Sequence, residues 1–135
     1  MKSITTICGY CGCGCGIRYT VADNGAILSV SPLPHHPVGK GKLCAKGWTG
    51  HNFVHHQDRL TTPLLRNETG GFSPISWDEA IALMTDRFTA IKEQAGPGSL
   101  ATFSSARCTN EENYLLGRLT RTAFNSPHID HCARL

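Results

Sequence analysis

The chain has 135 residues, a formal net charge of +3 with histidines neutral, 40% hydrophobic residues and 17% charged residues. That balance is typical of a globular protein and not of a disordered one. The small charge forms no clustered basic stripe and the apolar runs are short, so the composition excludes a dedicated nucleic-acid-binding protein and a membrane span.

Three cysteines near the N-terminus follow the pattern Cys8-x2-Cys11-x3-Cys15, and Cys44 comes from a distant segment. Three thiols on one loop and one from elsewhere are typical of a cubane iron–sulfur cluster, whereas structural zinc sites usually pair two short cysteine knuckles. Glycines alternate with these cysteines, which lets the backbone turn tightly and bring N–H groups toward the sulfur atoms. The pattern therefore favours an iron–sulfur cluster over a zinc ion.

The chain has seven cysteines and no apolar signal core or twin arginine at its start, so we expect a cytoplasmic protein with metal-binding thiols and no disulfide framework. Cys13 is a fifth thiol in the loop. Because the spacing is complete without it, we interpret Cys13 as a bystander, an alternative ligand being the other possibility. Cys108 and Cys132 are expected to be ordinary buried thiols. The pairs His35-His36 and His55-His56 are expected to be solvated and not metal-bound.

Residues 1–43 are expected to hold the cysteine loop and a small β unit. Two strands, Ile17–Val21 and Ala26–Val30, flank the turn Asp23-Asn-Gly25. Asn-Gly supplies the positive φ angles of a tight hairpin turn.

The next segment, residues 44–75, begins with the last of the four cysteines. A short helix is expected at about Gly47–His55, followed by an extended run over Arg59–Arg66. The turn Asn67–Gly71 then leads to a short strand near Phe72–Ile75.

Two helices with capping boxes are predicted after residue 75. Ser76-Trp-Asp-Glu79 opens the first helix, which Ala95-Gly-Pro97 ends. Its apolar stripe consists of Trp77, Ala80, Ile81, Met84, Phe88 and Ile91. Thr109-Asn-Glu-Glu112 opens the second helix, whose stripe consists of Leu115, Leu116, Leu119, Ala123 and Phe124.

Strands are predicted beside these helices, a buried one at Leu100–Ser104 and another starting at His128–Asp130. The order helix–strand–helix–strand is typical of an α/β unit with a parallel sheet. We therefore predict a mixed fold of α+β and α/β type. A small β-rich 4Fe–4S domain occupies residues 1–58, and residues 59–135 begin an α/β domain. The apolar stripes of such a segment are expected to be partly exposed.

The sequence also carries an ordered series of short motifs: Cys8-Gly-Tyr-Cys-x3-Cys15, Leu43-Cys-Ala-Lys-Gly47, Arg59-Leu-x2-Pro-Leu-Leu-Arg66, Ser76-Trp-Asp-Glu-Ala80, Ser105-Ala-Arg-x-Thr-Asn-Glu111 and Asp130-x-Cys-Ala-Arg134. Each motif is weak alone, but their ordered combination is specific. Together they resemble the N-terminal segment of the molybdenum or tungsten bis-pterin oxidoreductases, and most closely the catalytic subunit of formate dehydrogenase. The resemblance covers essentially the whole chain.

This resemblance implies two cofactors, a 4Fe–4S cluster and Mo or W bis-molybdopterin guanine dinucleotide. The implied cluster ligands are Cys8, Cys11, Cys15 and Cys44. Lys46 resembles the family's lysine between cluster and pterin, on the path of the electrons. A loop that approaches the pterin is expected to contain Arg107, Asn110 and Glu111. The Mo or W ligand is expected at the position after Leu135, so no catalytic residue is expected within this chain.

The implied reaction interconverts formate and carbon dioxide, and electrons leave past Lys46 through the cluster. The implied partners are iron–sulfur electron-transfer subunits or a hydrogenase. By itself the chain is predicted to be inactive. Its last residue precedes the metal-ligand position, which fits a selenocysteine codon, UGA, read as stop; the codon after Leu135 tests this expectation.

Three alternatives stay open at this point. The chain could belong to another molybdopterin oxidoreductase such as nitrate reductase, or be a stand-alone small iron–sulfur electron carrier, or be a zinc-stabilised interaction module. Iron with acid-labile sulfide would separate the first two from the third.

Overall fold

The computed structural model describes residues 1–132 and divides into two compact units. The first unit contains Met1–Arg59, Ser104–Leu115 and the residues from His131 onward, and the second contains Leu60–Phe103 and Leu116–Asp130. The predicted domain boundary at residue 58 stays a prediction. The residues after the predicted boundary contribute to both units, so neither unit is one continuous stretch of the sequence.

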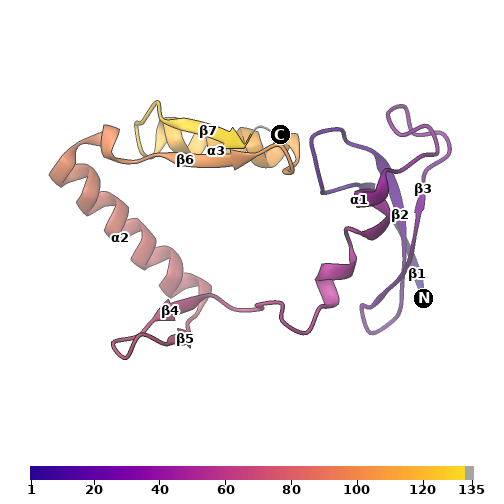
Figure 1. The fold of residues 1–135 in the computed structure, drawn as a ribbon, viewed down its shortest axis with the longest axis horizontal. Helices are drawn as coiled ribbons and strands as arrows, with labels where there is room; N and C mark the ends of the chain where they lie inside the picture. Colours follow the sequence, from indigo (N-terminus) through magenta and orange to yellow (C-terminus); the bar gives the residue numbers. More distant parts are fainter. Residues whose placement is uncertain (133–135) are drawn as a thin grey trace. The chain divides into compact units, whose positions relative to one another are not determined.

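The first unit begins with an antiparallel sheet in the order β1-β2-β3 (Figure 1), made of β1 (Lys2–Ile7), β2 (Gly16–Val21) and β3 (Ile27–Pro32). The hairpin between β2 and β3 confirms the predicted turn, in which the Gly25 amide donates to the Ala22 carbonyl at 3.0 Å. The strand β1 was not predicted. Its isoleucines and threonines favour strand, but every residue in it is exposed, so no apolar face marks it.

Two short helical segments replace the single helix predicted at about Gly47–His55. They are α1 (Ala45–Thr49) and the 3₁₀ turn η1 (Asn52–His55). The prediction was therefore wrong about where this segment starts and about its continuity. The amide of Gly50 donates to the Lys46 carbonyl at 2.7 Å, which ends α1, and the chain continues with tighter i→i+3 bonding.

In the second unit, β4 (Leu64–Arg66) and β5 (Phe72–Pro74) form an antiparallel hairpin, as the extended run and strand predicted. The helix α2 (Trp77–Ala95) follows. Its capping box is confirmed. The Ser76 amide donates to the Glu79 carboxylate at 2.7 Å, and the Glu79 amide donates to Ser76 Oγ at 3.2 Å. The Ser76 hydroxyl also donates to the Glu79 carboxylate at 2.8 Å. The bonds that the Ser76 amide and hydroxyl donate hold the pKa of the Glu79 carboxyl below its usual value.

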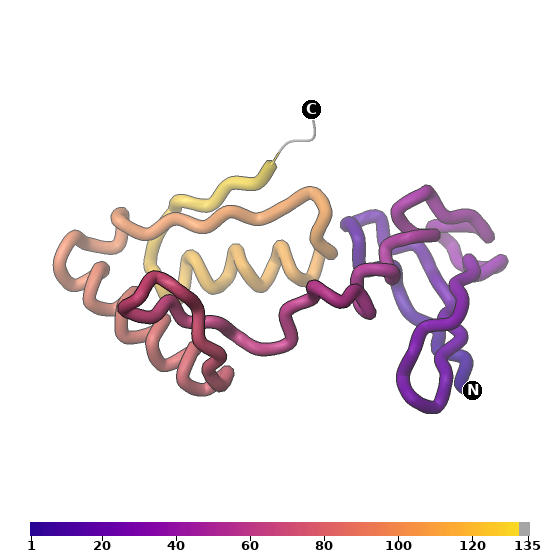
Figure 2. The backbone as a smooth tube through the Cα atoms, turned by 60° about the horizontal axis from the view of Figure 1, so that its bottom comes forward, coloured from indigo at the N-terminus to yellow at the C-terminus, as the bar shows by residue number. Residues whose placement is uncertain are grey.

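A short 3₁₀ turn, η2 (Pro97–Ser99), leads into β6 (Thr102–Ser105), α3 (Asn110–Thr122) and β7 (Ile129–Cys132). The strands β6 and β7 pair with each other and run in the same direction in Figure 1, and Figure 2 shows α3 alongside them. The capping box of α3 is also confirmed, with the Thr109 amide donating to Glu112 at 2.7 Å. The predicted α/β segment with a parallel sheet is therefore present.

The buried core is small. Among the described residues its apolar members are Ile17 and Leu100, and the buried polar side chains are Thr120 and Ser126. Ser126 Oγ donates to the Leu100 carbonyl at 2.6 Å, which satisfies both groups. The strand predicted at Leu100–Ser104 forms as β6 but begins only at Thr102. The prediction that it is buried was wrong for Phe103, which is 79% exposed, whereas the buried Leu100 precedes the strand.

The apolar stripes of α2 and α3 are largely exposed, as expected. Trp77 is 68% exposed and Leu115 is 59% exposed. None of the helices within residues 1–132 has both the length and the hydropathy that crossing a membrane requires.

Candidate metal centre

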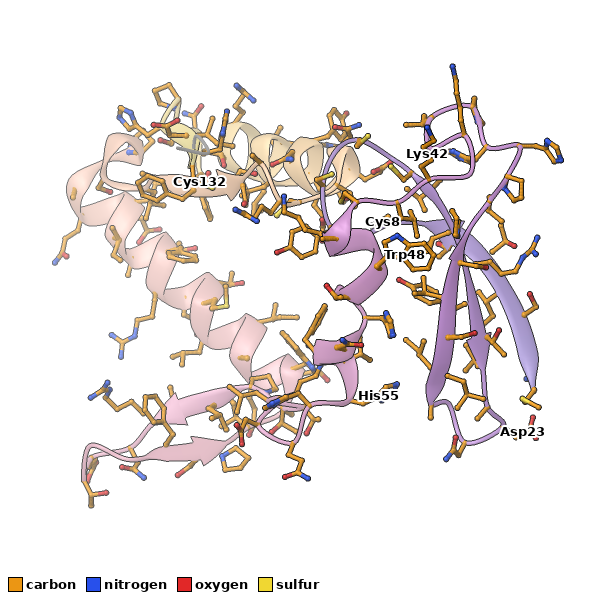
Figure 3. All side chains as sticks on the ribbon, turned by 45° about the vertical axis from the view of Figure 1, so that its right-hand side comes forward. Cys8, Asp23, Lys42, Trp48, His55 and Cys132 are labelled. Atoms are coloured by element: carbon orange, nitrogen blue, oxygen red, sulfur yellow. The ribbon has the colours of Figure 1, made fainter. Side chains whose placement is uncertain are left out.

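The cysteine loop, residues 8–15, joins β1 to β2 in the first unit (Figure 3). The Cys8 amide donates to the Cys15 carbonyl at 2.8 Å, next to the paired residues Ile7 and Gly16. The hairpin ladder therefore continues into the loop and closes it. Cys8 and Cys15 lie where the loop begins and ends, and Cys11 lies between them.

A cavity of about 210 Å³ lies between this loop and the start of α1. Its lining contains all four predicted ligands and the fifth thiol: Cys8, Cys11, Cys13, Cys15 and Cys44. Within residues 1–132, no group of three or more His, Cys, Asp or Glu side chains is already arranged around a metal position. The lining nevertheless offers three thiols from one loop and one from a separate segment, which is the donor set of a cubane cluster. The residues present therefore fit an iron–sulfur group.

The electrostatics of the thiols differ between the loop and the distant segment. The backbone N–H groups of Gly47 and Lys46 lower the pKa of the Cys44 thiol, and the Lys46 ammonium adds to this effect. Burial raises the pKa of Cys15 to about 11, with contributions from the Cys13 thiol and the other loop cysteines. Metal ligation requires the thiolate, so metal binding must displace a proton from Cys15 that the loop alone holds firmly.

Tyr10, which the sequence analysis did not single out, lies between two predicted site residues. The Lys46 Nζ atom is 5.8 Å from the centroid of the Tyr10 ring, and the Arg107 guanidinium carbon is 6.0 Å from it. Both distances are near the outer limit of a cation–π contact. Tyr10 and Lys46 also line the cavity. The aromatic residue inside the motif Cys8-Gly-Tyr-Cys11 was the available signal.

The predicted pterin contacts take different places in the structure. Asn110 Nδ2 donates to the Gly12 carbonyl at 2.9 Å, and a Cβ atom on Gly12 would collide with the Asn110 amide. Asn110 therefore contacts the cysteine loop directly. Glu111 lies exposed in the first turn of α3. Contact of Arg107, Asn110 or Glu111 with a pterin stays a prediction.

The remaining cysteines and histidines correct some expectations. Cys132 is exposed and its Sγ lies 3.4 Å from Ser105 Oγ, so the expectation that it is buried was wrong; Cys108 is half-buried. His36 Nδ1 accepts from the Gly16 amide at 3.2 Å, and His55 Nε2 accepts from the Ile27 amide at 3.1 Å. These histidines are therefore hydrogen-bond acceptors and not simply solvated.

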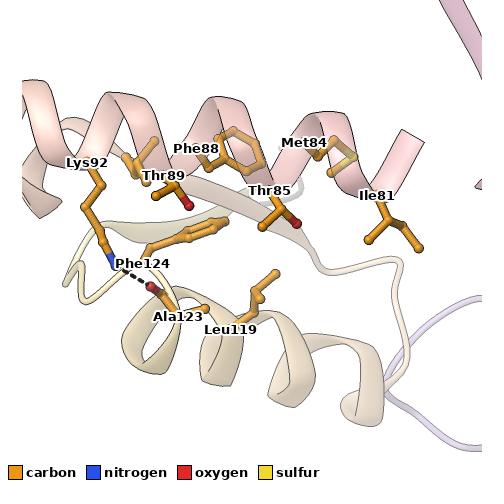
Figure 4. Close-up of a pocket in the computed structure, with 10 residues that line it drawn as sticks. Ile81, Met84, Thr85, Phe88, Thr89, Lys92, Leu119, Ala123 and Phe124 are labelled. Carbon is orange, nitrogen blue, oxygen red and sulfur yellow. Dashed lines mark hydrogen bonds between the residues drawn. The ribbon is translucent and has the colours of Figure 1, made fainter. Parts of the chain in front are cut away.

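A second cavity, of about 240 Å³, lies between α2 and α3 in the second unit (Figure 4). Its lining is mainly apolar, and Phe88 packs edge-on against Phe124 at a centroid distance of 5.1 Å. Lys92 Nζ donates to the Ala123 carbonyl at 3.0 Å at its edge. No thiol lines this cavity, and its side chains are those of a helix-packing seam. The position predicted for the Mo or W ligand, after Leu135, lies outside the described residues.

Four cysteine thiols around one cavity are the ligands that an iron–sulfur cluster uses. Comparison with known families agrees with an iron–sulfur site and also identifies the segment that follows it. Residues 1–56 match the molybdopterin oxidoreductase Fe4S4 domain, and residues 59–135 match the molybdopterin oxidoreductase family. The chain belongs to the molybdopterin oxidoreductase family. The predicted cofactor classes, a 4Fe–4S cluster and a molybdopterin, are confirmed for the protein to which these domains belong.

Formate dehydrogenases are among the relatives. The F420-dependent formate dehydrogenase subunit alpha of Methanocaldococcus jannaschii is 44% identical over 134 residues, which is 99% of this chain and 19% of that protein. The F420-dependent formate dehydrogenase 1 subunit alpha of Methanococcus maripaludis is 46% identical over 132 residues, 98% of this chain and 19% of that protein. A putative formate dehydrogenase of Staphylococcus aureus is 40% identical over 134 residues, 99% of this chain and 13% of that protein. The chain thus spans about one fifth or less of the length of these relatives.

Among solved structures, acetylene hydratase from Pelobacter acetylenicus matches with a TM-score of 0.70 and 24% identity, over 94% of this chain and 18% of that one. At this identity the likeness shows the fold alone. It agrees with the predicted architecture of a small β-rich region followed by a helix and strand region with a parallel sheet.

Proposed function

We propose that this chain forms the electron-transfer end of a formate-oxidising molybdenum or tungsten subunit, with Cys8, Cys11, Cys15 and Cys44 as the ligands of its 4Fe–4S cluster. The observation that carries the proposal is the cavity of about 210 Å³ whose lining contains all four thiols and Lys46. The full-length relatives named as formate dehydrogenases support formate as the substrate.

The chain's own residues have separate tasks in this proposal. The thiolates hold the iron, and the closed loop carries three of them into the lining of the cavity. The Lys46 side chain places a positive charge beside the cluster ligands, close to Tyr10. When bound, the cluster supplies reversible one-electron chemistry, whose potential depends on charge, burial and hydrogen bonds around the sulfur atoms.

The electron path past Lys46 belongs to the same proposal. The charge of Lys46 stabilises the reduced, more negative state of a nearby cluster. Electrons leaving the cluster would pass to iron–sulfur electron-transfer subunits or a hydrogenase, and F420 is a candidate final acceptor because two relatives are named F420-dependent. A cytoplasmic location remains part of the proposal.

Iron and acid-labile sulfide analysis of anaerobically prepared protein tests the metal centre. We expect about four iron and about four sulfide per chain, and a large loss of both when Cys8, Cys11, Cys15 and Cys44 are all changed to serine. The matched control is Cys108→Ser, which removes a thiol that does not line the cavity. One zinc per chain, or full iron content without the four cysteines, would contradict the ligand set.

The role of Lys46 is tested in the full-length subunit. Lys46→Gln should keep the iron content, lower the cluster's reduction potential and slow formate-dependent dye reduction. Lys42→Gln is the control, because Lys42 is an exposed lysine two positions before Cys44 that does not line the cavity. Equal potentials and rates in the two variants would remove Lys46 from the electron path. Nitrate reduction without formate oxidation would favour the other molybdopterin oxidoreductases.

A further inference from the structure

The cysteine loop contains one thiol more than a cubane needs. Cys13 lines the same cavity as the four proposed ligands, although the residue is exposed. The Cys15 thiol lies 3.6 Å from the Cys13 sulfur atom. A disulfide bond would place these atoms at about 2.05 Å, so the two groups are neighbouring free thiols.

The backbone explains why these two sulfur atoms lie together. Gly14, between them, has a φ angle of +74°, in the left-handed region that glycine adopts without the penalty of roughly 1–2 kcal/mol that other residues carry there. A Cβ atom on Gly14 would meet only the Ile7 side chain, at 4.0 Å. The requirement for glycine is therefore conformational, and it sets the turn that brings Cys13 to Cys15.

We propose that Cys13 is a reserve ligand for the iron atom that Cys15 holds. This inference rests on the proposed function, because it concerns the same cluster. Cys13 is the one additional thiol among the residues that line this cavity, and it is adjacent to one particular ligand.

The exchange is a ligand substitution without oxidation or reduction. The bond between iron and the Cys15 sulfur breaks and a bond between iron and the Cys13 sulfur forms. Cys13 releases its proton and Cys15 gains one, so charge and electron count are unchanged. Because Cys13 is exposed and Cys15 is half-buried, the exchange would move that corner of the cluster toward solvent.

The experiment compares variants of the whole chain after anaerobic reconstitution with ferrous iron and sulfide. Cys15→Ser and Cys15→Ala should each retain at least half of the wild-type iron and sulfide. Two changes are used because serine oxygen can itself bind iron and alanine cannot. The double variant Cys13→Ala/Cys15→Ala should lose nearly all of the iron. Cys44→Ala is the matched control, because Cys44 lies on a separate segment, and it should also lose nearly all of it.

Alkylation with iodoacetamide, mapped by mass spectrometry, identifies the bound thiol directly. In the wild-type holoprotein Cys13 should react and Cys15 should be protected, whereas in the holo form of Cys15→Ala, Cys13 should be protected. The electron paramagnetic resonance spectrum of the reduced cluster should also shift in that variant, because one iron corner has moved toward solvent.

Three results would overturn the inference. The first is that both Cys15 variants hold no more iron than the double variant. The second is that they hold iron while Cys13 still reacts with iodoacetamide. Wild-type protein without iron would overturn the proposed function, and the reserve-ligand role with it. The wild-type measurement therefore tells apart a failure of the cluster from a failure of the reserve ligand alone.

Discussion

The cysteine loop and the helix α2 obtain their shapes in different ways. The loop is closed by the bond from the Cys8 amide to the Cys15 carbonyl and by contact with Asn110, far along the chain. In contrast, α2 begins at a capping box made by neighbouring residues, Ser76 and Glu79. The first region depends on partners distant in sequence and on the cluster that we propose its thiols bind, whereas the second is specified locally.

Burial sharpens this comparison. The strand β1, which leads into the loop, has no buried residue, and Ile17 is the buried apolar side chain of the adjoining sheet within the described residues. A region with so small a core gains stability from a bound metal group, because metal binding is coupled to folding. We therefore expect the two regions to respond differently to loss of iron.

The largest effect is expected from removing iron from the reconstituted chain with a chelator. Amide hydrogen exchange at Cys8 should speed up by at least about 100-fold, or ~2.7 kcal/mol of lost ligand stabilisation. Exchange in the middle of α2 should change by less than about threefold in the same sample. Mass-spectrometric hydrogen exchange measures both regions at once, and equal acceleration in both would break the comparison.

A packing change in the second unit should produce the opposite pattern. Phe124→Ala removes the ring that packs against Phe88 and should destabilise this unit by about 2 kcal/mol, below the cost of a fully buried ring because Phe124 is half-buried. Phe103→Ala is the matched control, since Phe103 is 79% exposed, and should change stability by less than about 0.5 kcal/mol. Thermal unfolding and iron content are measured on the same samples. Loss of iron in Phe124→Ala would show that the cysteine loop and the second unit do not respond independently.

The smallest effect is expected from removing the capping box that begins α2. Ser76→Ala should destabilise α2 by about 1 kcal/mol, because it removes the side-chain cap on the Glu79 amide. Chemical denaturation monitored by circular dichroism measures the change. The exposed strand residue Ser29 provides the control, and Ser29→Ala should leave the midpoint nearly unchanged.

This cap also has a pH dependence of known sign. The pKa of Glu79 is lower in the folded helix than its ordinary value, mainly because of the Ser76 amide and hydroxyl. The stabilisation is therefore present above the ordinary carboxyl pKa and is lost as pH falls through the lowered folded value. In Ser76→Ala, the free energy of unfolding should therefore fall less steeply as the pH is lowered. An unchanged fall of stability at low pH would show that the cap does not determine the Glu79 pKa.

The features that could be predicted from sequence are those whose partners lie a few residues apart. Both capping boxes join residues three positions apart, and the Asn24-Gly25 turn specifies its own hairpin. The metal centre could be predicted for a different reason. Thiol spacing reports the geometry of the bound group, which is independent of the protein's own packing.

The features that were missed depend on distant partners. The strand β1 gains its order by pairing with β2, and its own residues show no buried face. The position of Tyr10 between Lys46 and Arg107 requires three separate segments to meet. Likewise, the proximity of Cys13 to Cys15 depends on one backbone angle at Gly14, whereas spacing alone favoured a bystander.

The hydrogen bond from Asn110 to Gly12 joins residues 98 positions apart. During synthesis, which proceeds from the N-terminus, the loop emerges from the ribosome long before the side chain that holds its Gly12 carbonyl. Iron delivered to the nascent polypeptide would therefore meet a looser loop than iron delivered after α3 has been made. The order of translation thus favours cluster insertion after α3 has been made.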